Sequence, residues 1–148
     1  MKICATRFNN STYRENIRWR ENNQEKGCIY NVPITIKNNI IGYKNLIVIE
    51  MNNERNKIEG FGIINSGVRV DKKYRMYNDY NYNRYTYIGE DYINRKDIPI
   101  EYNEILEDLE DAIFRGRRHI KRGQGITLIP ENIDKKYGKI INDLFSCN

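Results

Sequence analysis

The sequence predicts an α+β domain in which a strongly curved β-sheet or small β-barrel is flanked by two or three helices. Two apolar segments, residues 46–49 and 58–64, are separated by a polar turn, which is typical of an antiparallel hairpin. Apolar residues near the C-terminus recur at helical spacing. The chain has 148 residues, the usual size of one domain, so we expect a single domain over residues 1–148.

The first half of the chain predicts one helix and three strands. Residues 11–20 open with good N-cap residues and predict a short polar helix. Residues 27–36 contain β-branched residues and a proline, which indicates a loop that enters an edge strand. Residues 46–49, Leu-Ile-Val-Ile, are the best candidate for a central strand. Gly60 and Gly62 fall on one face of the next strand, where sharp barrel curvature or the close approach of another backbone favours glycine.

The second half predicts two strands and two helices. Residues 84–93 have the composition of a strand. Apolar residues over 105–113 have helical spacing, and Gly116 is placed to end that helix. Residues 126–129 resemble a final strand that stops at a proline. Residues 133–144 then give the clearest helical periodicity of the chain.

Composition excludes several classes of protein. No apolar run approaches the ~20 residues of a membrane span, and the N-terminus has no apolar signal segment. Cysteines stand only at positions 4, 28 and 147, without a Cys-x-x-Cys pair, and the chain has one histidine. We therefore expect no zinc or other metal, no cofactor, no disulfide framework, and reduced thiols in an intracellular compartment.

A tyrosine-rich segment is the first candidate binding element. Seven of the 12 tyrosines lie within residues 74–92, interleaved with lysines and arginines. Aromatic faces that alternate with cations are typical of surfaces for unpaired nucleobases. The alternative is a tyrosine-rich strand packed on its neighbours, in a chain whose 24 Ile and 21 Asn suggest A+T-rich codons. The candidates for stacking and for a phosphate contact are Tyr82, Tyr85, Tyr87 and Arg84.

A basic, glycine-containing segment is the second candidate. Residues 115–122 carry five positive charges and a histidine, and two glycines follow. Such a loop favours contact with phosphates and with a base edge. Two alternatives stay open: a solvated helix C-terminus, and pairing with the six acids of residues 101–111. The candidate residues are Arg117, Arg118, His119, Lys121, Arg122, Gly123, Gln124 and Gly125.

Two single residues have ambiguous roles. His119, the only imidazole, is a candidate for stacking or hydrogen bonding, and would be the acid/base if the protein were an enzyme. Trp19 lies between two arginines and is either a buried anchor or one wall of an aromatic cage.

Two resemblances follow from these segments. The turn-linked segments 46–49 and Ile58-Glu59-Gly60-Phe61-Gly62-Ile63-Ile64 resemble the central hairpin of the PUA-like superfamily, which includes the EVE, ASCH and YTH domains. The whole chain, especially residues 82–87 and 118–127, is similar to a protein family of large nucleocytoplasmic DNA viruses. The PUA-like resemblance implies a PUA/EVE-like barrel that binds RNA or modified bases through an aromatic pocket. The viral resemblance implies a location in the host cytoplasm, viral factory or virion. The Gly-x-Lys-x-x-Glu-x-Arg motif of ASCH domains has no counterpart near the N-terminus.

These observations favour a non-enzymatic nucleic-acid-binding module for single-stranded RNA or a modified nucleobase. Trp19 and the tyrosines would stack, the arginines and lysines would contact phosphates, and residues 123–125 would contact a base edge. Two other classes remain open. One is an enzyme that processes a nucleotide or nucleic acid with His119, and the other is a viral adaptor that binds a host protein through its tyrosines. The oligomeric state is left open.

Overall fold

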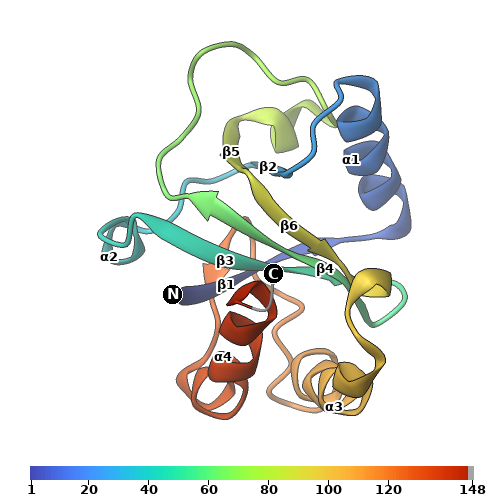
Figure 1. Ribbon diagram of the computed structural model, residues 1–148. Helices are drawn as coiled ribbons and strands as arrows, with labels where there is room; N and C mark the ends of the chain where they lie inside the picture. The colour runs from blue at the N-terminus through green and yellow to red at the C-terminus, as the bar shows by residue number, and fades with distance from the viewer. Residues whose placement is uncertain (147–148) are drawn as a thin grey trace.

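The computed structural model describes residues 1–146 and confirms the mixed α+β class (Figure 1). A five-stranded sheet has the order β6 (Asp91–Asn94), β4 (Lys57–Asn65), β3 (Asn45–Asn52), β1 (Lys2–Phe8) and β7 (Thr127–Leu128). A separate two-stranded sheet pairs β2 (Cys28–Val32) with β5 (Tyr85–Gly89). The strands are not closed into a barrel, so the closed form of the predicted sheet is not observed.

The predicted hairpin is confirmed at the centre of the larger sheet. β3 and β4 pair antiparallel, with Ile49 opposite Phe61 and Val48 opposite Gly62. β3 is the middle strand, and residues 46–52 are all buried. A run of four apolar β-branched or leucine residues therefore forms a strand that is covered on both faces.

The first strand was not predicted. β1 pairs parallel with β3, with Ile3 opposite Ile47 and Ala5 opposite Ile49, and antiparallel with β7. Its small residues Cys4, Ala5 and Thr6 give no strong hydrophobic alternation. They fit because the strand is buried between two neighbours, where small side chains suffice.

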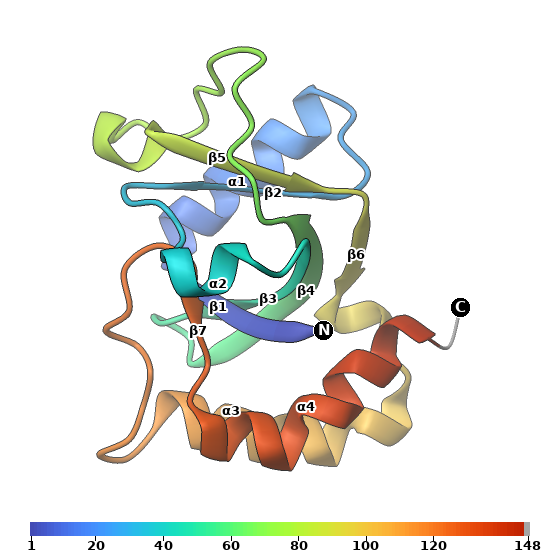
Figure 2. The ribbon, with the colours of Figure 1, turned by 90° about the vertical axis from the view of Figure 1, so that its left-hand side faces the viewer.

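The large sheet has a different cover on each face (Figure 2). Helices α3 (Asn103–Phe114) and α4 (Glu131–Ser146) pack on one face, and their apolar side chains form one core cluster with Ile47, Ile49 and Phe61. The opposite face meets the β2–β5 sheet together with α1 (Asn10–Asn22) and the single turn α2 (Asn38–Ile41). The four described helices exceed the two or three expected.

Two glycines let the small sheet approach the large one. A Cβ atom at Gly62 would lie 2.5 Å from both the Cys28 Sγ and the Tyr30 hydroxyl, and one at Gly89 would overlap the Ile63 carbonyl. Side chains at these positions would force the sheets apart. The close approach predicted at Gly62 is therefore present, although side chains of β2, and not its backbone, make the contact.

The remaining elements follow the sequence pattern with shifted bounds. α1 begins one residue earlier than predicted because Asn9 forms a capping box with Thr12. Gly116 has a φ of +77° just beyond the end of α3, as expected of a terminating glycine. The predicted strand 84–93 is divided at Glu90 between β5 and β6, which belong to different sheets. β2 pairs only with β5 but is buried along its whole length, because helices and loops cover its edge.

Three short 3-10 helices complete the chain: η1 (Tyr80–Asn83), η2 (Arg95–Asp97) and η3 (Ile100–Tyr102). Among residues 1–146, no helix combines the length and apolar character needed to cross a membrane. In the same residues, no group of three or more His, Cys, Asp or Glu is arranged to hold a metal ion. Cys4 and Cys28 are buried free thiols, and burial raises the pKa of each to about 12. Cys147 lies outside the described residues.

Candidate nucleic-acid interface

The two predicted clusters meet at one cavity, which we call the amide-lined pocket. It has a volume of about 640 Å³ and is lined by Tyr82 and Arg84 from the tyrosine-rich segment and by Gln124 and Gly125 from the basic segment. The ends of β1 and β2 complete its walls, and Asn9, Asn53 and Asn81 contribute further side-chain amides. Ligand pockets typically have volumes of about 300–1,000 Å³.

Two amide side chains, the buried Asn31 and the half-buried Asn83, fix the tyrosine-rich side of this pocket. The Asn83 Oδ1 accepts hydrogen bonds from the backbone N–H groups of Met76 (3.1 Å) and Tyr77 (3.0 Å). Asn31, on β2, donates to the Asn83 Oδ1 (3.0 Å) and to the Tyr74 carbonyl (2.7 Å). Because these bonds tie loop backbone to a buried strand, the loop has one defined path over β2.

The basic segment is anchored to the turn between β3 and β4. The Asn53 side chain donates to the Lys121 carbonyl (2.9 Å), and the Lys121 Nζ donates to the Asn56 Oδ1 (2.7 Å). Gly125 has a φ of +70°, and a Cβ there would lie 3.0 Å from a side-chain carbon of Ile34. A glycine is therefore required where the loop turns against the end of β2.

The pocket combines an apolar wall with polar groups. Phe8, Val32 and Ile34 line it, and Tyr82, which is 38% exposed, stands edge-on to Tyr77 with ring centroids 6.2 Å apart. Burial raises the pKa of Tyr77, so this phenol stays neutral. Arg7 and Arg84 are exposed cations of the wall. The arrangement suits a flat, polar heterocycle with an attached anion.

A second cavity adjoins the pocket, and we call it the basic tyrosine groove. It has a volume of about 880 Å³ and shares Arg84 with the pocket. Tyr85, a predicted stacking residue, is half-buried and lines this groove instead of the pocket.

Tyr87 is a correction to the sequence prediction. Its side chain is 0% exposed and belongs to the core cluster beneath the β2–β5 sheet. The Ile36 N–H donates a hydrogen bond to its hydroxyl (2.9 Å). A fully buried ring has no face available to an external base, so Tyr87 is a core residue.

Trp19 lies outside both cavities. The indole is half-buried and packs at 58° to Tyr74, with ring centroids 5.7 Å apart. Of the two interpretations of this residue, the contact favours a packing anchor, because neither cavity reaches the indole.

Residues 117–123 of the basic segment also lie outside both cavities. Within residues 1–146, the exposed Arg117, Arg118 and Arg122 form no ion pair with the acidic run, whereas Arg115 pairs with Asp111 at 3.2 Å. The Lys121 N–H donates to the His119 Nδ1 (3.3 Å). The prediction that all of this segment lines one site with the tyrosines therefore holds only for Gln124 and Gly125.

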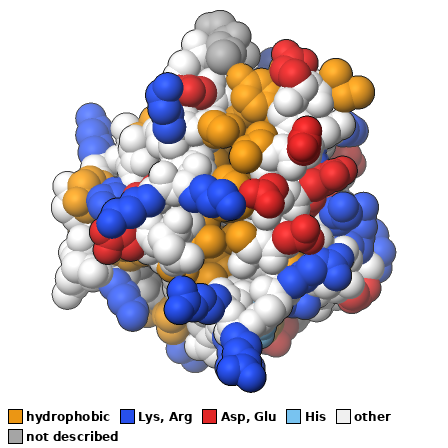
Figure 3. Space-filling model, turned by 90° about the horizontal axis from the view of Figure 1, so that it is seen from below, with side chains coloured by type: hydrophobic (Ala, Val, Ile, Leu, Met, Phe, Trp, Pro, Cys, Tyr) orange, Lys and Arg blue, Asp and Glu red, His pale blue; other side chains and the backbone are white. Residues whose placement is uncertain are grey.

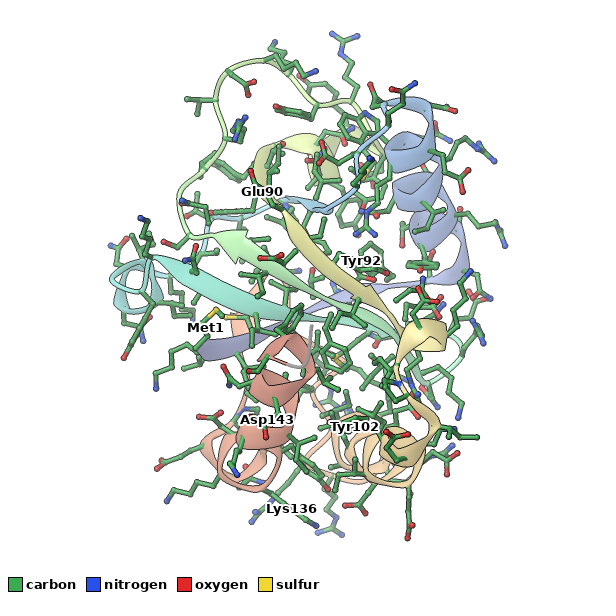
Figure 4. The ribbon with its side chains drawn as sticks, in the orientation of Figure 1. Met1, Glu90, Tyr92, Tyr102, Lys136 and Asp143 are labelled. Carbon is green, nitrogen blue, oxygen red and sulfur yellow. The ribbon has the colours of Figure 1, made fainter. Side chains whose placement is uncertain are left out.

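Sequence reasoning missed a buried ionic network beneath the pocket. Glu50, on β3, is 0% exposed and accepts hydrogen bonds from Arg20 (2.8 Å), Tyr30 (2.7 Å) and Tyr92 (3.0 Å). Figure 4 shows Tyr92 between β6 and α1, and its ring centre lies 4.4 Å from the Arg20 guanidinium. Burial would lower the pKa of Arg20, but the Glu50 carboxylate outweighs that effect, and the guanidinium stays charged.

A signal for this network was present in the sequence. Glu50 directly follows the Leu-Ile-Val-Ile run, and a charged residue inside a central strand needs a buried partner. The network also touches the pocket, because Tyr30 lines the pocket while its hydroxyl donates to Glu50.

No protein-family model, curated protein or solved structure matches the chain.

Proposed function

We propose that the protein is a nucleic-acid-binding module that holds one nucleotide of single-stranded RNA, or a modified base, in the amide-lined pocket. The observation that carries the proposal is the meeting of two segments far apart in the chain. Tyr82 and Arg84 line the same cavity as Gln124 and Gly125.

The chemistry of the wall supports a nucleotide as the ligand. Side-chain amides such as Asn81 and Gln124 offer both donors and acceptors, which match the edge of a nucleobase. The Tyr82 ring provides a stacking surface, and base stacking on an aromatic side chain contributes ~1–3 kcal/mol. Arg7 and Arg84 provide charge for a phosphate, and Asp79 is the one acid among the lining residues.

A relation to the PUA-like superfamily is part of the same proposal. It is supported by the central β3–β4 hairpin and by the second sheet that packs against β4 through Gly62 and Gly89. Membership of a viral family and an intracellular location are likewise proposed, on the residues that carry the resemblance.

Binding of labelled oligonucleotides tests the function. We expect fluorescence anisotropy to detect binding of single-stranded RNA at low salt, and Tyr82→Ala and Arg84→Ala to weaken it. Tyr43→Ala is the matched control, because Tyr43 is similarly exposed at 46% but lies outside both cavities.

The same titration decides between this function and the adaptor. Undetectable binding of RNA, DNA and nucleoside analogues at low salt, or equal effects of Tyr82→Ala and Tyr43→Ala, would contradict the proposal and favour a protein partner. Steep weakening of binding with salt is expected, because phosphate contacts release counterions.

A further inference from the structure

The basic tyrosine groove carries an excess of positive charge that the pocket does not explain. Five cations line it, and no carboxylate is among its lining residues; the cations are Arg69, Lys72, Lys73, Arg75 and Arg84. Arg69 is paired with Asp71 at 3.3 Å. Within residues 1–146, Lys72, Lys73 and Arg75 form no ion pair, and all three are exposed.

The opposite end of the molecule has a different charge pattern. Figure 3 shows acidic and basic side chains intermixed on the face made by α3 and α4. There Lys135 pairs with Glu131 at 3.2 Å, and Lys136 pairs with Asp108 at 3.4 Å. The charge of the groove is therefore a local feature and does not simply follow from the net charge of +5.

Aromatic rings lie among these cations. Tyr80 is 67% exposed, Tyr85 is half-buried, and the buried Tyr74 forms part of the wall beneath the Lys72 Nζ, which lies 5.1 Å from its ring centre. Exposed rings between cations provide stacking surfaces next to phosphate-binding groups. The carboxylates of an acidic peptide suit the lysines but provide no flat ring to stack on the tyrosines, whereas each nucleotide provides both an anion and a flat ring.

The groove is held in place by hydrogen bonds of its own and by some of those that shape the pocket. The Arg69 N–H donates to the Thr86 carbonyl on β5 (2.7 Å), and the Asn78 N–H donates to Glu15 on α1 (2.7 Å). Together with the bonds of Asn31 and Asn83, these contacts fix both ends of the loop between β4 and η1. A surface that is ordered before binding loses less conformational entropy when a ligand arrives.

We infer that the groove binds the nucleotides that flank the one held in the pocket. The preferred ligand is then a single-stranded polynucleotide that runs from the pocket past Arg84 into the groove, and not a free nucleotide. Arg84 lines both cavities, so it marks the point where the strand passes from one to the other. The inference rests on the proposed function, because the groove alone does not select a base.

Length dependence of binding tests this inference. Single-stranded RNAs of two and ten nucleotides are titrated against the full chain, its Lys72→Ala/Lys73→Ala variant and its Tyr82→Ala variant. We expect the wild-type protein to favour the longer RNA at least tenfold, because only that RNA reaches the groove. Loss of Lys72 and Lys73 should remove most of this preference and lower the salt slope by ~1.4, from two phosphate contacts of a single strand. Tyr82→Ala should weaken both lengths alike.

The matched control is Lys135→Ala/Lys139→Ala, which removes two exposed lysines from α4. Figure 4 places the neighbouring Lys136 at the end of the molecule opposite the loop that forms the groove. We expect this control to keep the length preference and, by circular dichroism, both double variants to keep the wild-type melting temperature.

Three results would overturn the inference while leaving the function intact. They are an unchanged length preference in Lys72→Ala/Lys73→Ala, equal affinity for a ten-base-pair duplex, and displacement of the RNA by polyglutamate at equal charge concentration. The last result would assign the groove to an acidic protein. If wild-type protein binds neither RNA length, the proposed function fails, and the inference fails with it.

Discussion

Two regions of this protein use the same residue types in opposite ways. Around Glu50, an arginine and two tyrosines surround a carboxylate that is completely buried. In the basic tyrosine groove, arginines, lysines and tyrosines lie at the surface, and Lys72, Lys73 and Arg75 have no ion-pair partner among residues 1–146.

The difference lies in where the partners are. Arg20 and Glu50 neutralise each other inside the fold, so the network contributes to the stability of one arrangement of α1 on the sheet. Lys72, Lys73 and Arg75 of the groove, which have no ion-pair partner among residues 1–146, can be neutralised only by something outside the fold. The presence of an ion-pair partner inside the fold, and not residue type, therefore separates a structural cluster from a candidate binding surface.

The largest expected effect comes from breaking the buried pair. Arg20→Met should lower the free energy of unfolding by ~3–5 kcal/mol, because it leaves the Glu50 carboxylate buried without its cation. Glu50→Gln should cost a similar amount, since it leaves Arg20 charged and buried. Urea denaturation followed by circular dichroism measures both.

The double variant separates pairing from packing. Arg20→Met/Glu50→Gln removes both charges but keeps a side-chain oxygen for Tyr30 and Tyr92, so it should be more stable than either single variant. Additive losses, or single variants as stable as the wild-type protein, would contradict the interpretation of the network as a mutually dependent pair.

The comparison also explains which parts of the fold the sequence predicts. The apolar run 46–49, which both covered faces of β3 impose, and the helical spacing of α3 and α4 are local patterns, and they were predicted. β1 was not, because Cys4, Ala5 and Thr6 become a strand only through pairing with β3. The two-sheet arrangement also depends on non-local contacts, such as Gly89 against the Ile63 carbonyl.

For the candidate site, the sequence indicated two segments that line one cavity, but not how deeply each of their residues is buried. Residues two apart on a strand, such as Tyr85 and Tyr87, share one face, yet Tyr87 is buried and Tyr85 is not fully covered. Burial along β5 depends on how far each residue extends over the core, which no local pattern encodes. The meeting of Arg84 with Gln124 depends on the hydrogen bonds of Asn31, Asn53 and Asn83, which link distant segments.

A pair of tyrosine variants sharpens the contrast between core and surface. Tyr87→Phe should lower the free energy of unfolding by ~1–3 kcal/mol, because the buried Ile36 N–H loses its acceptor, and should leave RNA affinity unchanged. Tyr82→Ala should weaken RNA binding by ~1–3 kcal/mol through lost stacking.

The contrast holds only if Tyr87→Phe mainly changes stability and Tyr82→Ala mainly changes RNA affinity. Tyr82→Ala is expected to cost at most ~1 kcal/mol of stability, since it loses mainly its contact with Tyr77. Weakened RNA binding by Tyr87→Phe at a temperature where it is fully folded would place Tyr87 in the binding machinery and contradict its assignment to the core.

The smallest expected effect tests whether an unpaired positive charge is sufficient for RNA binding when it lies outside the cavities. Arg118 is exposed and lies outside both cavities. Lys121 is less suitable for this test because it also bonds to Asn56. Arg118→Ala should weaken RNA binding by less than ~1 kcal/mol and lower the salt slope by at most ~0.7, the share of one single-strand phosphate contact. Arg84→Ala should have the larger effect, because Arg84 lines both cavities.

Anisotropy titrations at several salt concentrations measure these slopes, with Lys139→Ala as a control for the loss of one exposed charge. If Arg118→Ala weakens RNA binding as much as Arg84→Ala does, the basic segment 117–122 contacts the RNA as strongly as the groove does. The interface then extends beyond the two cavities. If Arg118→Ala matches Lys139→Ala, the segment contributes only to the general positive field. In that case the site is restricted to the residues around the pocket and the groove, where charge and aromatic surface occur together.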